Sequence, residues 1–400
     1  MRYLLLATHV PRSGSGGGIV RYTVELADAL HRRADVELHV LATHDGAAFF
    51  ASLLPVARIH PVPAAPVAVR SLLERERPTP GGFDVVHGAK HLVPRRSRGA
   101  STVLTVHDTL LLDRPADFGR AKRLLLRRPY LASVREADVL VCVSRATRAR
   151  LLDYVPTAGD RVRVVPLAAS TALAAAPAEP VPPLVGRPFA LVIGDASARK
   201  NLQLVVDGWP RVRAAVPRAV LAVVGPPDWG RTHRGSTWAE QVADGAVLPL
   251  GHVTDGALRW CYEHASVVLC PSVLEGFGLP TVEALRFGAP VVTSEDPALC
   301  EAAGGRGVAV PARDRDAWVR ATVAGLCGER RRPEAAPRSW DDVAARDPRG
   351  RAAGGPCLLT RSGSASRPTS PRCPRCTWCR PVRHTTSSAW PWCIARTAGR

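Results

Sequence analysis

The sequence predicts an α/β protein made of two Rossmann-like, doubly wound domains that face a central cleft. Its 400 residues exceed what one ordinary hydrophobic core holds and suit two domains of the usual size. Short apolar runs alternate with helix-like stretches, which is the pattern of βαβ units and a parallel sheet. A Pro- and Ala-rich stretch near the middle interrupts this alternation. We therefore expect a ligand cleft between the halves, at the C-terminal ends of their strands.

The first domain is predicted to span residues 1–168. Its expected strands are short apolar runs, namely Tyr3–Ala7, Val36–Leu41, Val85–His87, Thr102–His107 and Val139–Val143. Val20–Arg32 and Ala146–Leu152 are the expected helices, and Ser144 is a suitable N-cap for the second of them. This half is predicted to form one doubly wound domain.

Residues 169–188 are predicted to be an interdomain linker. The runs 174–177 (Ala-Ala-Ala-Pro) and 180–183 (Pro-Val-Pro-Pro) argue against a regular helix or a central strand. The second domain is then expected at 189–337. Its predicted strands are Phe189–Ile193, Ala219–Val224, Val247–Leu250, Val267–Cys270 and Pro290–Thr293. Its predicted helices are Leu202–Ala215, Asp255–Ala265, Pro280–Phe287 and Arg315–Leu326.

The C-terminal part changes character. Residues 338–347 are expected to begin a further helix, and its pattern is lost at Ala345. Residues 348–400 contain arginines but no Asp, Glu or Lys, so we predict a disordered tail or one read out of frame from an Arg-rich gene. Cys373, Cys376 and Cys379 have a spacing that can chelate zinc, but without a second cysteine pair or a well-placed His they are a weak metal-site candidate.

The formal net charge of +19 does not predict a nucleic-acid partner, because much of the excess lies in that tail rather than on one folded face. A second basic run, 120–128, surrounds Leu124, Leu125 and Leu126. Two interpretations stay open for it, a solvated helix face and a helix that rests on anionic lipid headgroups.

The expected location is the cytoplasm, with peripheral contact at the inner face of the cell membrane as an option. Cysteines outside the tail are scattered among apolar residues, as reduced core thiols are. No apolar run reaches the ~18 residues of a spanning helix, and the first residues resemble a core strand more than a signal peptide.

The strongest chemical signal is the loop 272–284, which follows a predicted strand. Its glycines, Gly276 and Gly278, allow close backbone approach, and Pro280 suits the first turn of a helix. Such a loop offers backbone amides and a positive helix end to a phosphate. Glu275 and Glu283 can both point into the same cleft, one near a sugar and the other toward ribose hydroxyls. Structural glutamates that complement the helix dipole are the alternative interpretation.

A second signal is the segment 194–201, which follows the predicted strand Phe189–Ile193. Here Arg199 and Lys200 lie side by side at the C-terminal end of a strand, where they can neutralise a diphosphate. A metal ion is then unnecessary. A solvated Arg-Lys pair is the alternative.

These motifs resemble the retaining glycosyltransferases of family four, which have the GT-B fold, from about Met1 to Ala345. The glutamate pair with seven residues between its members is the most specific element. The resemblance implies that Glu283 binds the donor ribose, that Glu275 contacts the transferred sugar, and that Arg199 and Lys200 hold the diphosphate. It also implies that His107 contacts the sugar. The residues implied at the donor site are Gly17, Gly18, Arg199, Lys200, Gly276, Phe277, Gly278, Leu279 and Glu283.

The implied reaction is front-face transfer of a hexose, with mannose as the first guess, from a GDP- or UDP-linked donor to a glycan or lipid-linked acceptor. Glu275, His107, Arg199 and Lys200 are the implied catalytic residues, with no cofactor and no metal. The sequence departs from the family at Leu167 and Ala168, where an Asn-Gly pair is common. The resemblance further implies that the last helix crosses back to the first domain.

Three rival interpretations remain. A nicotinamide oxidoreductase is suggested by Gly14 and Gly16 after a strand, but the dinucleotide fingerprint is incomplete because residue 19 is Ile. A nucleotide-sugar epimerase of the same fold would consume donor without an acceptor. An inactive member that only binds nucleotide is the non-enzymatic alternative.

Overall fold

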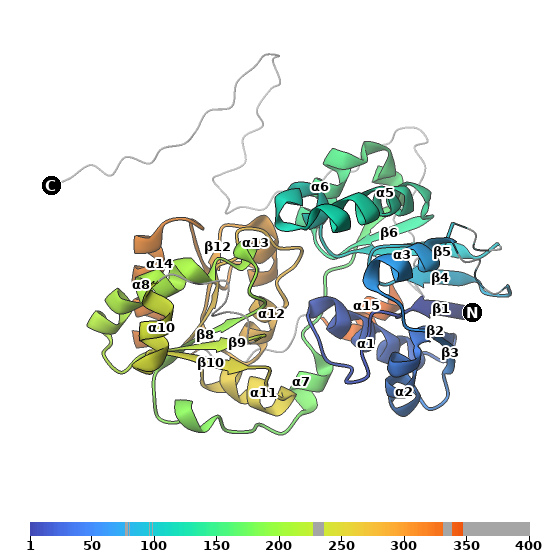
Figure 1. Cartoon of the computed structure of the whole chain (residues 1–400). Helices are drawn as coiled ribbons and strands as arrows, with labels where there is room; N and C mark the ends of the chain where they lie inside the picture. The colour runs from blue at the N-terminus through green and yellow to red at the C-terminus, as the bar shows by residue number, and fades with distance from the viewer. Residues whose placement is uncertain are drawn as a thin grey trace, which may run out of the picture. The chain divides into compact units, whose positions relative to one another are not determined.

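The computed structural model describes residues 1–76, 79, 81–95, 97, 99–226, 236–330 and 338–346. Of the sequence-based expectations, the tail at 348–400, with its three-cysteine motif, lies outside these residues. Within the described chain every paired strand is parallel, and the strands form two separate sheets, which confirms the predicted fold class (Figure 1).

The first sheet has seven strands in the order β3-β2-β1-β4-β5-β6-β7. These strands are β1 (Arg2–Leu6), β2 (Glu37–Thr43), β3 (Arg58–Val62), β4 (Val85–Gly88), β5 (Ser101–Val106), β6 (Val139–Cys142) and β7 (Val162–Val164). The chain runs outward from β1 to β3 and then returns to β4 on the other side of β1. The strand order therefore reverses between β1 and β4, which is where doubly wound sheets hold their ligands.

Helices connect these strands, and one of them carries a predicted cap. They are α1 (Gly18–His31), α2 (His44–Leu53), α3 (Val67–Glu76), α4 (Leu110–Asp113), α5 (Arg120–Glu136) and α6 (Arg145–Tyr154), with 3₁₀ turns η1 (Pro115–Asp117) and η2 (Pro156–Arg161). Ser144 caps α6 by accepting a hydrogen bond from the amide of Thr147, as its position predicts. The sequence pattern predicts no helix or strand between β2 and β4, whereas the structure has α2, β3 and α3 there.

The second sheet has six strands in the order β10-β9-β8-β11-β12-β13. These strands are β8 (Phe189–Ile193), β9 (Val220–Val224), β10 (Val247–Gly251), β11 (Val267–Cys270), β12 (Val291–Ser294) and β13 (Val308–Val310). The helices are η4 (Ala198–Lys200), α8 (Leu202–Ala215), α10 (Ser236–Ala243), α11 (Asp255–His264), α12 (Leu279–Arg286), α13 (Pro297–Ala303) and α14 (Arg315–Cys327). Here the order reverses between β8 and β11, which places the second ligand position beside the first turns after these two strands.

The predicted linker 169–188 is more ordered than its composition suggested. It contains the helix α7 (Thr171–Ala175) and the 3₁₀ turn η3 (Pro182–Leu184). The expectation that no regular helix forms there was wrong, because the prolines begin only at Pro177 and the Ser170 hydroxyl accepts a hydrogen bond from the amide of Leu173. The domain boundaries themselves stay a prediction.

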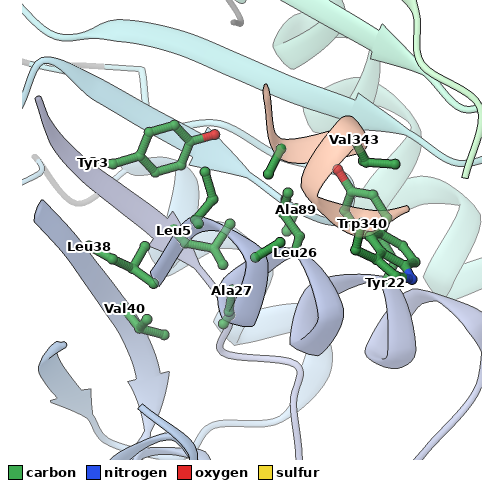
Figure 2. Packing of buried hydrophobic residues seen from close by; sticks show 14 of the residues in the cluster. Tyr3, Leu5, Tyr22, Leu26, Ala27, Leu38, Val40, Ala89, Trp340 and Val343 are labelled. Atoms are coloured by element: carbon green, nitrogen blue, oxygen red, sulfur yellow. The ribbon is translucent and has the colours of Figure 1, made fainter. Parts of the chain in front are cut away.

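The last described helix, α15 (Trp340–Ala345), lies against α1 of the first domain (Figure 1). Figure 2 shows Trp340 and Val343 packed among core residues of this domain, beside Tyr22 and Leu26. The Trp340 indole is 1% exposed, and its Nε1 donates a hydrogen bond to the carbonyl of Ala169 at 3.1 Å. This helix therefore fastens the end of the described chain to both the first domain and the start of the linker.

Candidate active site

The residues singled out from the sequence follow strands at the two reversal points. Gly17 and Gly18 come after β1, while Arg199 and Lys200 come after β8. Glu275 comes after β11, the direct neighbour of β8 in the second sheet. Because parallel strands end at the same edge of their sheet, the pairing of β8 with β11 brings the loops that follow these strands together.

Glu275 forms a compact charge cluster with Arg199 and Lys200. Its Oε1 lies 2.6 Å from Lys200 Nζ and 3.0 Å from Arg199 Nη1, and all three side chains are less than one-fifth exposed. Burial alone would raise the pKa of Glu275, but the charges of Lys200 and Arg199 hold that pKa below its ordinary value. The carboxylate is therefore charged at neutral pH, and it joins the two cations that the sequence analysis assigned to a diphosphate.

Asn201 anchors this cluster, although the sequence analysis gave it no role. It has a left-handed backbone conformation (φ 53°), which asparagine tolerates better than most residues. Its Nδ2 donates hydrogen bonds to the carbonyls of Pro271, at 3.2 Å, and Ala312, at 2.8 Å. The amide of Val273 also donates to the carbonyl of Arg199 at 2.8 Å. The loops after β8 and β11 are thus held as one unit.

Gly276 is required by a close contact with the first domain. A Cβ at this position would lie 1.7 Å from the carbonyl oxygen of His107. The Gly276 carbonyl accepts hydrogen bonds from the hydroxyls of Ser144, at 2.6 Å, and Thr147, at 2.9 Å. The sequence analysis attributed this glycine to close approach of a ligand, whereas in the structure the backbone that it approaches is that of His107.

Two helix N-termini meet beside this contact. Gly278 caps α12 with a φ of 101°, a conformation that favours glycine, and α12 then begins at Leu279. Gly17 caps α1, and a Cβ on Gly18, the first residue of α1, would lie 3.4 Å from Leu279 Cδ1. Helix N-termini carry partial positive charge and unsatisfied amides, so two of them at one point favour an anion.

Glu283, on α12, is buried in a polar cluster of its own. Its Oε2 accepts a hydrogen bond from the Tyr262 hydroxyl at 2.8 Å, while its Oε1 is buried without a partner among the described residues. Burial raises the pKa of Glu283, and the charge of Arg21 opposes this rise. An unpaired buried acceptor is rare and calls for an explanation, for which a bound hydroxyl donor is sufficient.

His107 lies at the end of β5 and is 8% exposed. Its Nε2 donates a hydrogen bond to the Ala89 carbonyl at 2.8 Å, and its ring packs edge to face with Tyr22 at 4.6 Å between centroids. Burial lowers the pKa of His107 to about 4, so the imidazole is neutral at neutral pH. The structure thus brings the backbone of His107 to Gly276, while the Nε2 atom of His107 is hydrogen-bonded to the Ala89 carbonyl.

The sequence analysis missed the residues that support this site from other elements. Arg150 donates to the Glu275 carbonyl and pairs with Asp296, both at 2.6 Å, and Arg21 pairs with Asp255 at 2.7 Å. A lone arginine on a predicted helix carries no motif, so only the fold reveals these contacts. Tyr262 had no signal either, since its hydroxyl partner Glu283 is 21 residues away in the sequence.

The family comparison matches both halves of the chain. Residues 16–173 match the family described as "Glycosyltransferase Family 4", and residues 187–326 match "Glycosyl transferases group 1". The two matched segments contain all the site residues discussed above.

Individual relatives agree with this assignment. "O-antigen chain mannosyltransferase B" of Escherichia coli is 28% identical over 246 residues, covering 58% of this chain and 62% of the relative, so the match spans about three-fifths of that protein. "D-inositol 3-phosphate glycosyltransferase" of Actinosynnema mirum is 30% identical over 364 residues, covering 77% of this chain and 82% of the relative.

A solved structure shows the same two-domain fold. Sucrose-phosphate synthase from Thermosynechococcus elongatus superposes with a TM-score of 0.59 at 20% identity, covering 87% of this chain and 93% of the other. The architecture is therefore the GT-B fold. In the described part of this chain, no helix combines the length and apolar character needed to cross a bilayer.

The charge cluster predicts a pH dependence of stability. Because the folded pKa of Glu275 lies below its ordinary value of 4.5, its charge stabilises the fold above that pH, and this contribution disappears as the pH falls through the folded pKa. Glu275→Gln should therefore lower the free energy of unfolding by about 2 kcal/mol at neutral pH. The difference from the wild type should shrink below pH 4.5, as measured by urea unfolding across a pH series.

Glu295→Gln is the matched control, because this glutamate of the same domain is exposed and forms no ion pair among the described residues. Its effect should be small and flat across the series. A Glu275→Gln effect that stays constant, or grows, toward acid would contradict the assigned ion pairs.

Proposed function

The chain belongs to glycosyltransferase family 4, the group 1 glycosyltransferases, and from this premise we propose that it transfers a hexose from a nucleotide diphosphate sugar with retention of configuration. The observation that carries the proposal is the meeting of two helix N-termini, at Gly18 and Leu279, in a site that also contains Arg199 and Lys200. Together they offer what a diphosphate needs, namely amides, helix dipoles and two cations.

The diphosphate binds to the positive groups that Glu275 engages in the structure. A guanidinium has five N–H donors, so Arg199 can hold Glu275 and a phosphate oxygen at once. Lys200 adds a compact charge. As the bond from the sugar to the diphosphate breaks, negative charge grows on the leaving oxygen, and these fixed cations stabilise it without a metal ion.

The donor ribose binds at Glu283. Its unpaired Oε1 is a buried acceptor, and a ribose hydroxyl supplies the missing donor. Tyr262 holds the other oxygen of the same carboxylate and so fixes the direction in which Oε1 points.

The transferred sugar lies between Glu275 and the first domain. Glu275 accepts hydrogen bonds from sugar hydroxyls, while the neutral imidazole of His107 borders the sugar from the other side. The acceptor hydroxyl attacks from the face that the diphosphate leaves and gives its proton to the leaving phosphate oxygen, which keeps the anomeric configuration.

Mannose is the proposed sugar, carried by GDP or UDP, and the proposed acceptor is a glycan or a lipid-linked glycan in polysaccharide synthesis. The support is that the Escherichia coli relative is named as a mannosyltransferase of an O-antigen chain.

Nucleotide binding tests the donor site directly. Purified protein should show a thermal shift with one of UDP, GDP, ADP and dTDP, and EDTA should not change it; a ligand at ~100 times its Kd adds about 2.7 kcal/mol of stability. Glu283→Ala should weaken binding of the selected nucleotide by roughly 1.5–3 kcal/mol, because the ribose loses the buried hydrogen-bond acceptor of this side chain.

Glu263→Ala serves as the control, since this glutamate, on α11 of the same domain, pairs with Arg259. It should leave nucleotide affinity unchanged. Equal affinities of wild type and Glu283→Ala would remove Glu283 from the site, and the absence of a shift with every nucleotide would contradict the donor site.

The products distinguish transfer from epimerisation. With the selected nucleotide linked to α-mannose and a mannoside acceptor, proton NMR should show an α-linked product. Lys200→Met should lower kcat by at least ~100-fold, because leaving-group stabilisation of this kind contributes several kcal/mol. A β-linked product would exclude retention, and an altered donor sugar without transfer would identify an epimerase.

We also propose peripheral contact with an anionic membrane through α5. Leu124 is 74% exposed and Leu125 is 38% exposed, and Arg127 and Arg128 are exposed on the same helix. Apolar side chains beside basic ones are the composition of interfacial helices.

Sedimentation with phosphatidylglycerol vesicles tests this contact. Arg127→Gln with Arg128→Gln should weaken binding about tenfold or more, since each basic residue near the surface contributes ~1 kcal/mol. Val56→Ser, which alters an exposed apolar residue elsewhere in the first domain, should have no effect. Binding that is unchanged in the double variant, or absent in the wild type, would identify α5 as a solvated helix.

A further inference from the structure

A cavity of about 310 Å³ lies where the chain passes between the two domains. Its lining includes residues 166–169, where the first domain meets the linker, and Arg338, the first described residue after the second domain. Arg145 of the first domain and Arg286 and Arg306 of the second also line it. We call it the hinge cavity.

The hinge cavity is separate from the candidate donor site. None of Glu275, Glu283, Arg199, Lys200 and His107 lines it. On α12, the lining residues Val282, Leu285 and Arg286 share one face of the helix, and Glu283 is turned about 100° away from Val282. The aromatic ring of Phe277 is the element that the two sites share.

Positive charge dominates the lining of the hinge cavity. Four arginines face one carboxylate, that of Glu301. This carboxylate already accepts hydrogen bonds from the backbone amides of Arg145 and Ala146, at 2.8 Å and 3.4 Å, at the N-terminus of α6. Its charge therefore acts on the helix end as well as on Arg338, and one carboxylate does not balance four arginines.

Three of the four guanidinium groups lack an anionic partner. In the described part of the chain, no carboxylate lies within ion-pair distance of Arg145, Arg286 or Arg338, and Arg338 makes only a long hydrogen bond of 3.4 Å to the Leu167 carbonyl. Burial, together with the charge of nearby Arg346, lowers the pKa of Arg338. Such a group gains more from an added anion than from any contact it has now.

The rest of the lining is apolar, with Leu167, Phe277, Val282 and Leu285 as its larger side chains. A cavity with an apolar floor and a few convergent charged groups is typical of small-molecule sites, and 310 Å³ is at the small end of their range. Arginine forks match the geometry of phosphate oxygens, often with two parallel hydrogen bonds.

We propose that the hinge cavity binds the phosphate group of a small phosphorylated molecule through Arg145, Arg286 and Arg338. Such a ligand contacts the first domain, the second domain and the returning segment at once, so it adds a bridge between the domains that is independent of the nucleotide sugar.

Calorimetric titration tests the site with the full-length protein, in the presence of a saturating nucleotide that occupies the donor site. The probes are inorganic phosphate and glucose 6-phosphate, with sulfate-free buffer. We expect saturable binding of at least one probe. Arg286→Gln with Arg338→Gln should weaken it at least about tenfold, because charge-assisted hydrogen bonds to the anion are lost. Arg218→Gln, an exposed arginine that does not line the cavity, should not weaken it.

The single variant Arg145→Gln keeps the test valid if the double variant does not fold, since Arg145 is an exposed surface residue. It should also weaken binding and leave the melting temperature without ligand unchanged. Tighter binding of glucose 6-phosphate than of phosphate would show that the cavity also contacts the sugar. Equal binding would show that it contacts the phosphate group alone. Both results support the site. The proposal is overturned if neither probe binds, or if binding persists in all cavity variants and is lost in Lys200→Met.

Discussion

The contact between Gly276 and the carbonyl of His107 is the constraint on which the candidate active site depends. No other residue fits, because a Cβ would lie 1.7 Å from the carbonyl oxygen. The contact fixes the loop after β11 against the first domain, and Ser144, Thr147 and Arg150 then hold the carbonyls of Gly276 and Glu275. The same docking sets Leu279 beside Gly18, so both helix N-termini depend on one glycine.

The charges of the site follow from this arrangement. Two cations in a region less than one-fifth exposed would repel each other if left alone, but Glu275 pairs with both of them and Asp195 also pairs with Arg199. A carboxylate held in this way has a role both in the free protein and in the protein with a bound donor. In the proposed reaction, it keeps Arg199 and Lys200 in place before the diphosphate binds, and it then accepts hydrogen bonds from sugar hydroxyls.

The sequence was sufficient to predict those elements that depend on neighbouring residues in the chain. Strand β8, strand β11 and helix α8 have the predicted bounds, because the two strands are short, continuous apolar runs and the helix has an apolar face. The cluster of Glu275 with Arg199 and Lys200 was also foreseeable, since each residue follows a strand end. The surroundings of Glu283 were not foreseeable, because its hydrogen-bond partner Tyr262 and the nearby charge of Arg21 lie on helices whose pattern shows only which face is buried. The linker helix α7 was missed because the nearby prolines outweighed a single capping serine.

The returning helix α15 is connected to the centre of the first domain through rings that pack edge to face. Trp340 packs edge to face on Tyr22 at 5.8 Å, and Tyr22 packs in the same way on His107 at 4.6 Å. His107 in turn supplies the carbonyl that Gly276 contacts. Trp340 also donates a hydrogen bond to the carbonyl of Ala169, which lines the hinge cavity. The chain passes between the domains once at the linker and once before α15, and this hydrogen bond joins the two segments. This row of rings connects the wall of the hinge cavity, through Trp340, to the carbonyl of His107 that the loop after β11 contacts. The position of α15 therefore matters to the site even though none of its residues belongs to it.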